Sequence, residues 1–170
     1  MARLVRLKNT RLLWISGAAA TALTYTAPTV AQLTPGTGIV AIHANMTKNY
    51  DVAMDDSDSV TELGVDDDSK IEVPTIRSYH GMLEFFRDFD ASTSLPTATD
   101  CTALITENTL GYIVKREGLP SATAVAAAQI VEVYQFRTDV WKFSKEDGLI
   151  KASIKLWQQG RYATQAVVAS

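Results

Sequence analysis

The sequence is poor in the residue types on which most catalytic and metal sites depend. Its 170 residues include one cysteine, Cys101, and two histidines, His43 and His80. A single cysteine excludes an intrachain disulfide, and neither histidine has a metal-ligating neighbour at the spacing of a zinc site. The chain also lacks a glycine-rich dinucleotide motif, a P-loop and a nucleophile elbow. We therefore predict a protein that is not an enzyme, with no cofactor and no metal.

Positive charge and long apolar runs are scarce as well. Sixteen Lys and Arg residues against 19 Asp and Glu residues give a net charge of -3. This balance argues against a dedicated nucleic-acid-binding protein, because phosphate binding needs clustered basic side chains. No run of about 18 apolar residues occurs, so no membrane span is predicted. Hydrophobic residues make up 46% of the chain, which is enough to build the core of one domain.

The first 36 residues carry positive charge and no acidic residue. They contain two prolines and many threonines, so we predict an extended N-terminal arm over residues 1–36, with a short strand near Leu12 to Ser16. The single domain then covers residues 37–170. The basic residues of the arm are Arg3, Arg6, Lys8 and Arg11.

The same segment supports an alternative. A basic start, an apolar stretch from Leu12 and small residues near Ala31 resemble a signal peptide over residues 1–31. Ser16, Gly17 and Thr21 dilute the apolar stretch, which weakens this interpretation. Under it, the protein would be a secreted bacterial β-sandwich with a binding or adhesion function.

Residues 51–72 are predicted to form a long solvated loop, because like charges repel each other and resist packing. Lys70 is the one basic residue of this segment. The acidic residues are Asp51, Asp55, Asp56, Asp58, Glu62, Asp66, Asp67, Asp68 and Glu72.

The acidic loop does not fit a calcium-binding EF-hand. With Asp56 as the first ligand, Val60 takes the place of the third oxygen ligand. Thr61 replaces the turn glycine, and Asp67 stands where a bidentate glutamate is expected. Opportunistic calcium binding by residues 66–68 remains open.

The rest of the chain is rich in β-formers. Residues 149–157 alternate between apolar and polar, which predicts a strand with one buried face. Asp147-Gly148 favours a tight turn before it, so residues 141–144 should pair with this strand antiparallel. One helix is predicted from Thr97, as its cap, to Asn108. Further strands are predicted at residues 38–44, 70–73, 79–89, 110–115 and 129–138. The pattern indicates a mainly β domain with a mostly antiparallel arrangement.

Several segments in order carry a resemblance to a known family. These are residues 27–37 (APTVAQLTPGT), 73–75 (VPT), 79–88 (YHGMLEFFRD), 110–114 (LGYIV) with Arg116 and Gly118, Val133-Tyr134, Thr138-Asp139, Gly160-Arg161 and 167–169 (VVA). Together they resemble the major tail tube protein of long, non-contractile-tailed bacteriophages. The basic start and the acidic loop depart from the family's pattern.

The resemblance implies two packed β-sheets, as a sandwich or barrel, with one flanking helix. It implies hexameric rings that stack into a tube around a tape-measure protein and join tail-end proteins. The tube would conduct DNA into the host without binding it specifically, and it would belong to the virion tail after assembly in the host cytoplasm.

An arm and a loop of opposite charge suit head-to-tail contacts between copies, since contacts that do not close along an axis build filaments. The candidate inter-subunit residues are therefore Arg3, Arg6, Lys8, Arg11, Asp55, Asp56, Asp58, Asp66, Asp67 and Asp68.

Overall fold

The fold is mainly β and is built on one antiparallel sheet. The computed structural model describes residues 9–56, 58–63, 70–146 and 149–170. Within them, eight strands form a sheet in the order β2-β1-β7-β8-β10-β6-β3, with β9 paired to β10. The strands of this sheet are β1 (Thr10–Ser16), β2 (Ile39–Ala41), β3 (Asp51–Met54), β6 (Tyr79–Phe86), β7 (Leu110–Glu117), β8 (Ile130–Thr138), β9 (Lys142–Glu146) and β10 (Leu149–Val167).

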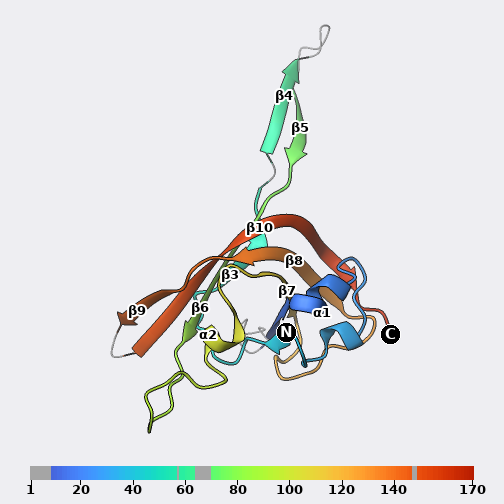
Figure 1. Ribbon diagram of the computed structural model, residues 1–170. Helices are drawn as coiled ribbons and strands as arrows, with labels where there is room; N and C mark the ends of the chain where they lie inside the picture. The colour runs from blue at the N-terminus through green and yellow to red at the C-terminus, as the bar shows by residue number, and fades with distance from the viewer. Residues whose placement is uncertain (1–8, 57, 64–69, 147–148) are drawn as a thin grey trace, which may run out of the picture.

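The expectation of two packed sheets is corrected to a single sheet that bends. Strand β10 is 19 residues long and pairs with β6 and β9 at its start and with β8 along the remainder. Figure 1 shows it as a long arch over the molecule. One strand therefore links both halves of the sheet, and side chains from the two halves meet on the concave face in one core.

Strand β1 explains why the central strands show no simple alternation. Leu12, Leu13, Trp14 and Ile15 are each 1% exposed. Leu12 and Trp14 join the core on the concave face, whereas Leu13 and Ile15 join a second core on the opposite face. A strand that is buried on both faces reads as a continuous apolar run. This burial makes β1 a central element of the domain.

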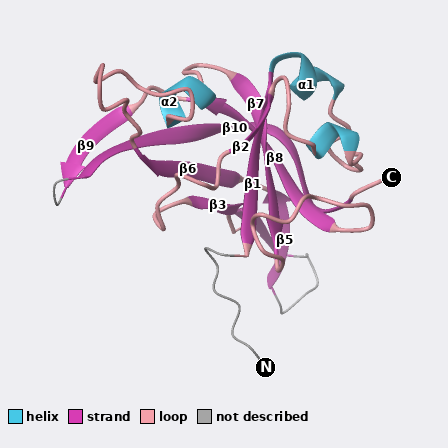
Figure 2. Ribbon diagram, turned by 90° about the horizontal axis from the view of Figure 1, so that it is seen from below, coloured by secondary structure: helices cyan, strands magenta, loops and turns pink. Residues whose placement is uncertain are grey.

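The second core is covered by the residues that follow β1. Helix α1 (Gly17–Ala22) leads to Leu23, and the 3-10 turn at Ala31–Leu33 adds Leu33. Both leucines are buried. Figure 2 shows this segment lying beside β7 and β8. The prediction of an extended arm over residues 1–36 is therefore wrong for residues 10–36, which pair with the sheet or cover it, while residues 1–8 lie outside the described part.

The predicted helix is much shorter than expected. Helix α2 spans Cys101–Leu104, and its cap is Asp100, whose side chain accepts a hydrogen bond from the Thr102 N–H. Thr97 hydrogen-bonds instead to the carboxylate of Asp88. Asp100 is buried, so the cap is fixed by packing that sequence cannot show. Together with α1, the described residues hold two short α-helices rather than one longer one.

The acidic segment also differs from the prediction. Within the segment 51–72, the described residues form strand β3, strand β4 (Asp58–Leu63) and the start of strand β5 (Lys70–Ile76) rather than a loop. Valine, threonine and isoleucine alternate with the acids there, and these β-formers favour extended backbone. The predicted hairpin of residues 141–144 and 149–157 is confirmed by the pairing of β9 with β10. Its turn at residues 147–148 lies outside the described residues.

Candidate functional site

The feature that lies apart from both cores is the hairpin of β4 and β5. Its strands pair with each other in antiparallel register, from Asp58 opposite Ile76 to Leu63 opposite Lys70. Among the described residues, neither strand pairs with the eight-stranded sheet. Figure 1 shows the hairpin standing away from that sheet. An isolated two-stranded hairpin is only marginally stable in water. Because the described residues of β4 and β5 do not pair with the main sheet, this hairpin gains little stability from its own subunit.

At the base of the hairpin, His80 lies between two carboxylates. Asp51 Oδ2 is 3.0 Å from His80 Nε2, and Asp55 Oδ1 forms a short hydrogen bond with His80 Nδ1. The Asp55 bond is the strongest cause of a raised pKa at His80, and Asp51 adds to it against the opposing effect of partial burial. The bridge ties both ends of β3 to the start of β6, where the hairpin leaves the sheet.

The neighbouring Tyr79 holds the bent part of β10. Its hydroxyl donates to the Gln135 carbonyl at 2.7 Å and accepts a hydrogen bond from the Gln159 N–H at 3.1 Å. The Tyr79 N–H donates to Gln158 Oε1 at 2.9 Å. The register between β10 and β8 shifts at this point, between Gln158 and Tyr162. Burial raises the pKa of the Tyr79 hydroxyl, so it remains a neutral hydrogen-bonding group that joins β6, β8 and β10.

The predicted acidic contact residues therefore separate into different environments. Asp55 is engaged by His80 within its own subunit. Asp56 and Asp58 are exposed at the start of the hairpin. Asp66, Asp67 and Asp68 lie outside the described residues.

The predicted basic contact residues are corrected at Arg11. Its side chain is 8% exposed, and Nη1 donates to the carbonyls of Ser121 at 3.0 Å and Thr123 at 3.2 Å. Arg11 therefore holds the loop after β7 and is not a surface charge for a second copy. Arg3, Arg6 and Lys8 lie outside the described residues.

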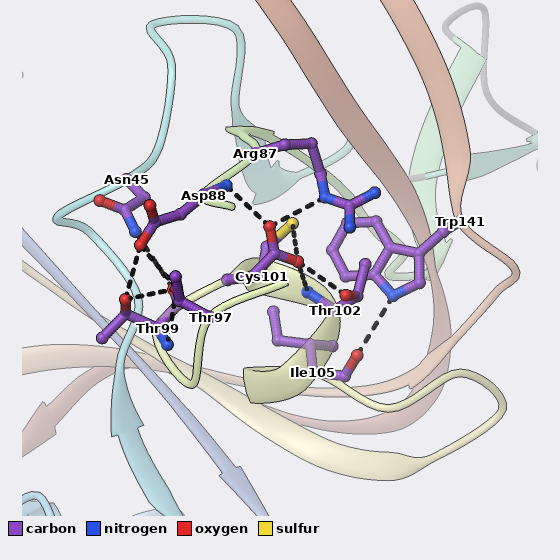
Figure 3. A network of polar contacts seen from close by, with 10 residues as sticks. Asn45, Arg87, Asp88, Thr97, Thr99, Cys101, Thr102, Ile105 and Trp141 are labelled. Carbon is purple, nitrogen blue, oxygen red and sulfur yellow. Dashed lines mark hydrogen bonds and ion pairs between the residues drawn. The ribbon is translucent and has the colours of Figure 1, made fainter. Parts of the chain in front are cut away.

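A second polar network fixes the segment between β6 and α2 (Figure 3). Asp100 Oδ2 accepts hydrogen bonds from Arg87 Nε at 2.9 Å and from the Asp88 N–H at 2.8 Å. Its Oδ1 accepts from Thr102 N–H and Oγ1. Burial favours the neutral acid, but these hydrogen bonds, led by Arg87, outweigh it and lower the pKa of Asp100 to about 2. The carboxylate therefore serves as a structural anchor.

The remaining candidate groups are poorly suited to chemistry. Burial, with the nearby Asp100 carboxylate, raises the pKa of the Cys101 thiol to about 12, so a nucleophilic thiolate is disfavoured. Burial lowers the pKa of His43. The described residues contain no group of three or more His, Cys, Asp or Glu side chains that could hold a metal ion. In the same residues, no helix is both long and apolar enough to cross a membrane.

Sequence reasoning treated His80 as isolated, and the structure corrects this. Its partners are 25 and 29 positions away, and they meet it through the pairing of β3 with β6, in which Ala53 lies opposite His80. A correct prediction of the pairing between β3 and β6 would have placed the two aspartates next to His80. The role of Tyr79 was missed as well, because it depends on an irregular register in β10.

Comparison with known proteins gives a consistent result. A chain of similar fold occurs in a solved structure titled "Cryo-EM structure of the anti-feeding prophage (AFP) baseplate, 6-fold symmetrised". It aligns with a TM-score of 0.52 and 9% identity, covering 96% of this chain and 97% of that one. No curated protein matches the sequence significantly. The family model described as "Phage tail tube protein" matches residues 1–170, and the chain therefore belongs to the phage tail tube protein family.

Proposed function

We propose that this chain assembles into hexameric rings that stack into a phage tail tube, through which the genome passes into the host. The observation that carries the proposal is the family match over the whole chain. The similar fold of a chain in the six-fold symmetrised baseplate of the anti-feeding prophage supports rings of six. The β4–β5 hairpin gains little stability from its own subunit, so it is suited to a contact with another copy that repeats along a tube.

The proposed partners follow from a tube of this kind. The subunit binds copies of itself, encloses a tape-measure protein and joins tail-end proteins, while DNA passes without specific binding. Its role is structural and not catalytic, in the virion tail after assembly in the host cytoplasm. Of the acidic residues predicted to contact a second copy, Asp56, Asp58 and residues 66–68 remain proposed contacts, and Asp55 positions the hairpin through His80.

The secreted alternative is disfavoured by the position of β1. Cleavage near Ala31 would remove the strand that lies between β2 and β7, with Trp14 and its buried neighbours. Both cores would lose side chains. The mass of the protein from its native source decides this point, since a mature chain that starts at Gln32 would support secretion.

The assembly itself is tested with the purified chain. We expect electron microscopy to show rings or tubes with six-fold averages, and sedimentation to show large particles that increase with protein concentration. A chain that stays monomeric over a wide range of concentration and salt would overturn the proposal.

A further inference from the structure

A polar cleft of about 620 Å³ lies beside helix α1. The helix forms one side of it, and Leu110 and Tyr112 of β7 and Gln135 of β8 form another part. Gln159 and Arg161, from the bent part of β10, complete the lining. Three segments that are far apart in sequence therefore meet around this cleft.

A bulge in β10 makes room for the cleft. The register between β10 and β8 shifts between Gln158 and Tyr162. Residues 159–161 therefore lie opposite Gln135 alone. Gly160 in the middle of the bulge has a φ of +86°, and a Cβ there would meet no atom within 4 Å. Bulges bend a strand and redirect its side chains, and they are frequent beside functional sites.

Two buried polar side chains in the cleft have unused hydrogen-bonding groups. Tyr112 is 2% exposed and Gln135 is 8% exposed. They lie opposite each other on β7 and β8, and Gln135 Nε2 donates to the Tyr112 hydroxyl at 3.0 Å. Within the described part of the chain, Gln135 Oε1 accepts no hydrogen bond and the Tyr112 hydroxyl donates none. Since buried polar groups without partners are costly, the cleft offers one acceptor and one donor side by side to an occupant.

Arg161 adds a positive charge to these two groups. It is exposed, and among the described residues its guanidinium forms no hydrogen bond or ion pair. Its backbone carbonyl accepts a hydrogen bond from the Tyr79 hydroxyl at 3.2 Å, which fixes the chain at this point. None of the described residues that line the cleft is acidic. The charge of the cleft is therefore complementary to an anionic group.

An extended polypeptide has the matching pattern of groups. In an antiparallel ladder, one residue exchanges both its N–H and its C=O with the residue opposite, so both groups point to the same side. Such a residue can donate its N–H to Gln135 Oε1 and accept from the Tyr112 hydroxyl, while an acidic side chain reaches Arg161. A phosphate group has only acceptor oxygens, so it would leave Gln135 Oε1 without a donor.

We propose that this cleft binds an extended, acidic segment of a different protein. The main chain of that segment pairs with Tyr112 and Gln135, and an aspartate or glutamate side chain pairs with Arg161. The inference goes beyond the proposed tube, because it assigns the subunit a binding site for a partner that is not a second copy of itself.

The experiment measures fluorescence anisotropy of two labelled peptides with the purified chain, below the concentration at which it assembles. Thr-Val-Asp-Val-Thr consists largely of residues that favour extended backbone, and Thr-Val-Asn-Val-Thr is its neutral match. We expect the aspartate peptide to bind about fivefold more tightly, the upper range for one exposed ion pair. Arg161→Gln should remove this preference. The control Arg77→Gln changes an exposed arginine outside the cleft and should keep it.

Tyr112→Phe tests the contact with the main chain. The ring that packs in the second core remains, but the hydroxyl donor is lost. Both peptides should therefore bind about fivefold more weakly, and the preference for aspartate should persist. Circular dichroism of each variant checks that it is folded.

Four results would overturn the inference. The first is the absence of saturable binding of the aspartate peptide at millimolar concentration, and the second is equal affinity of the wild type for both peptides. The third is assembly that Arg161→Gln weakens while peptide binding stays unchanged, which would assign the cleft to a second copy. The fourth is single-stranded DNA that binds the wild type but not Arg161→Gln, without binding of either peptide. Since each result concerns the cleft and not whether the wild-type chain forms tubes, the proposed function is tested separately.

Discussion

Arg11 and Arg116 lie directly opposite each other on β1 and β7, and both donate a hydrogen bond to the carbonyl of Thr123. Two like charges side by side are unfavourable, and burial followed by the charge of Arg11 lowers the pKa of Arg116. The backbone carbonyls of the loop after β7 accept hydrogen bonds from both guanidinium groups and so offset this repulsion. Arg116 also donates to the carbonyls of Leu119, Pro120 and Ala124. The two arginines therefore hold the loop of residues 119–124 through its backbone carbonyls.

Replacing Arg116 should destabilise the subunit more than replacing Arg11. Arg116 is 2% exposed and makes hydrogen bonds to four carbonyls, whereas Arg11 makes two. We expect Arg116→Ala to lower the free energy of unfolding by about 3 kcal/mol and Arg11→Ala by about 1 kcal/mol. Urea unfolding measures both. Equal effects, or an effect of Arg11→Ala on the salt dependence of assembly without loss of stability, would contradict this role.

The bridge at His80 should make stability depend on pH near neutrality. Because its folded pKa is raised, the bridge contributes fully below the unfolded value of about 6.5 and is lost as pH rises through the folded pKa. The melting temperature of the wild type should therefore exceed that of His80→Gln by more at pH 6 than at pH 9. The difference should be small, since the His80 side chain is 44% exposed.

His43 provides a control of opposite sign. Burial lowers its folded pKa, so the folded protein loses stability as pH falls below about 6.5. The gap in melting temperature between the wild type and His43→Gln should shrink towards low pH. If both histidine variants changed in the same direction, the bridge from His80 to Asp51 and Asp55 would not be the cause.

The sequence predicted the elements whose residues show a regular local pattern. Strand β10 alternates over residues 152–156, and its pairing with β9 follows from the turn dipeptide between them. The predicted strand at residues 110–115 corresponds to β7 and that at residues 129–138 to β8. A mainly β, antiparallel fold follows from these strands. The sequence did not predict how the strands combine. One long strand joins two halves of a bent sheet, and no local pattern indicates this.

Long-range contacts explain the other differences. Arg11 looked like a surface charge because nothing near it in sequence shows that Ser121 and Thr123 supply its acceptors 110 and 112 residues away. The run at Leu12 resembled part of a signal peptide because a strand buried on both faces and a short apolar helix have the same composition. Asp100 caps the helix in place of Thr97, so the helix starts later than predicted. Arg87 holds the Asp100 carboxylate, and sequence spacing does not reveal that contact.

Asp100 should be one of the most sensitive polar positions. It is buried, and Arg87 beside it is 9% exposed, so removing the charge of Asp100 leaves a buried guanidinium without its partner. We expect Asp100→Asn to cost about 3 kcal/mol of unfolding free energy at pH 7. The folded pKa is lowered to about 2, so this contribution is present above about pH 3.9 and decreases as pH falls below it.

Asp90 is the matched control for this acid-linked loss. Hydrogen bonds from Ser92, followed by those from Thr93, lower the pKa of Asp90 to about 2 as well, but the residue is exposed. Asp90→Asn should leave the urea midpoint close to that of the wild type. A loss as large as that of Asp100→Asn would show that the loop around residue 90 matters more than the buried pair.

Tyr79→Phe tests whether the bent part of β10 is held from β6. The change keeps the ring, which packs against Phe136 at 5.2 Å between centroids, and removes the hydroxyl that joins Gln135 and Gln159. The Gln159 N–H then loses its acceptor, so we expect a cost of about 1–3 kcal/mol and faster hydrogen exchange at that amide. Tyr134→Phe removes a hydroxyl that donates to Glu132 and should not change exchange at Gln159. Unchanged protection of Gln159 in Tyr79→Phe would mean that the backbone pairing of β10 with β8 holds the bend without the tyrosine.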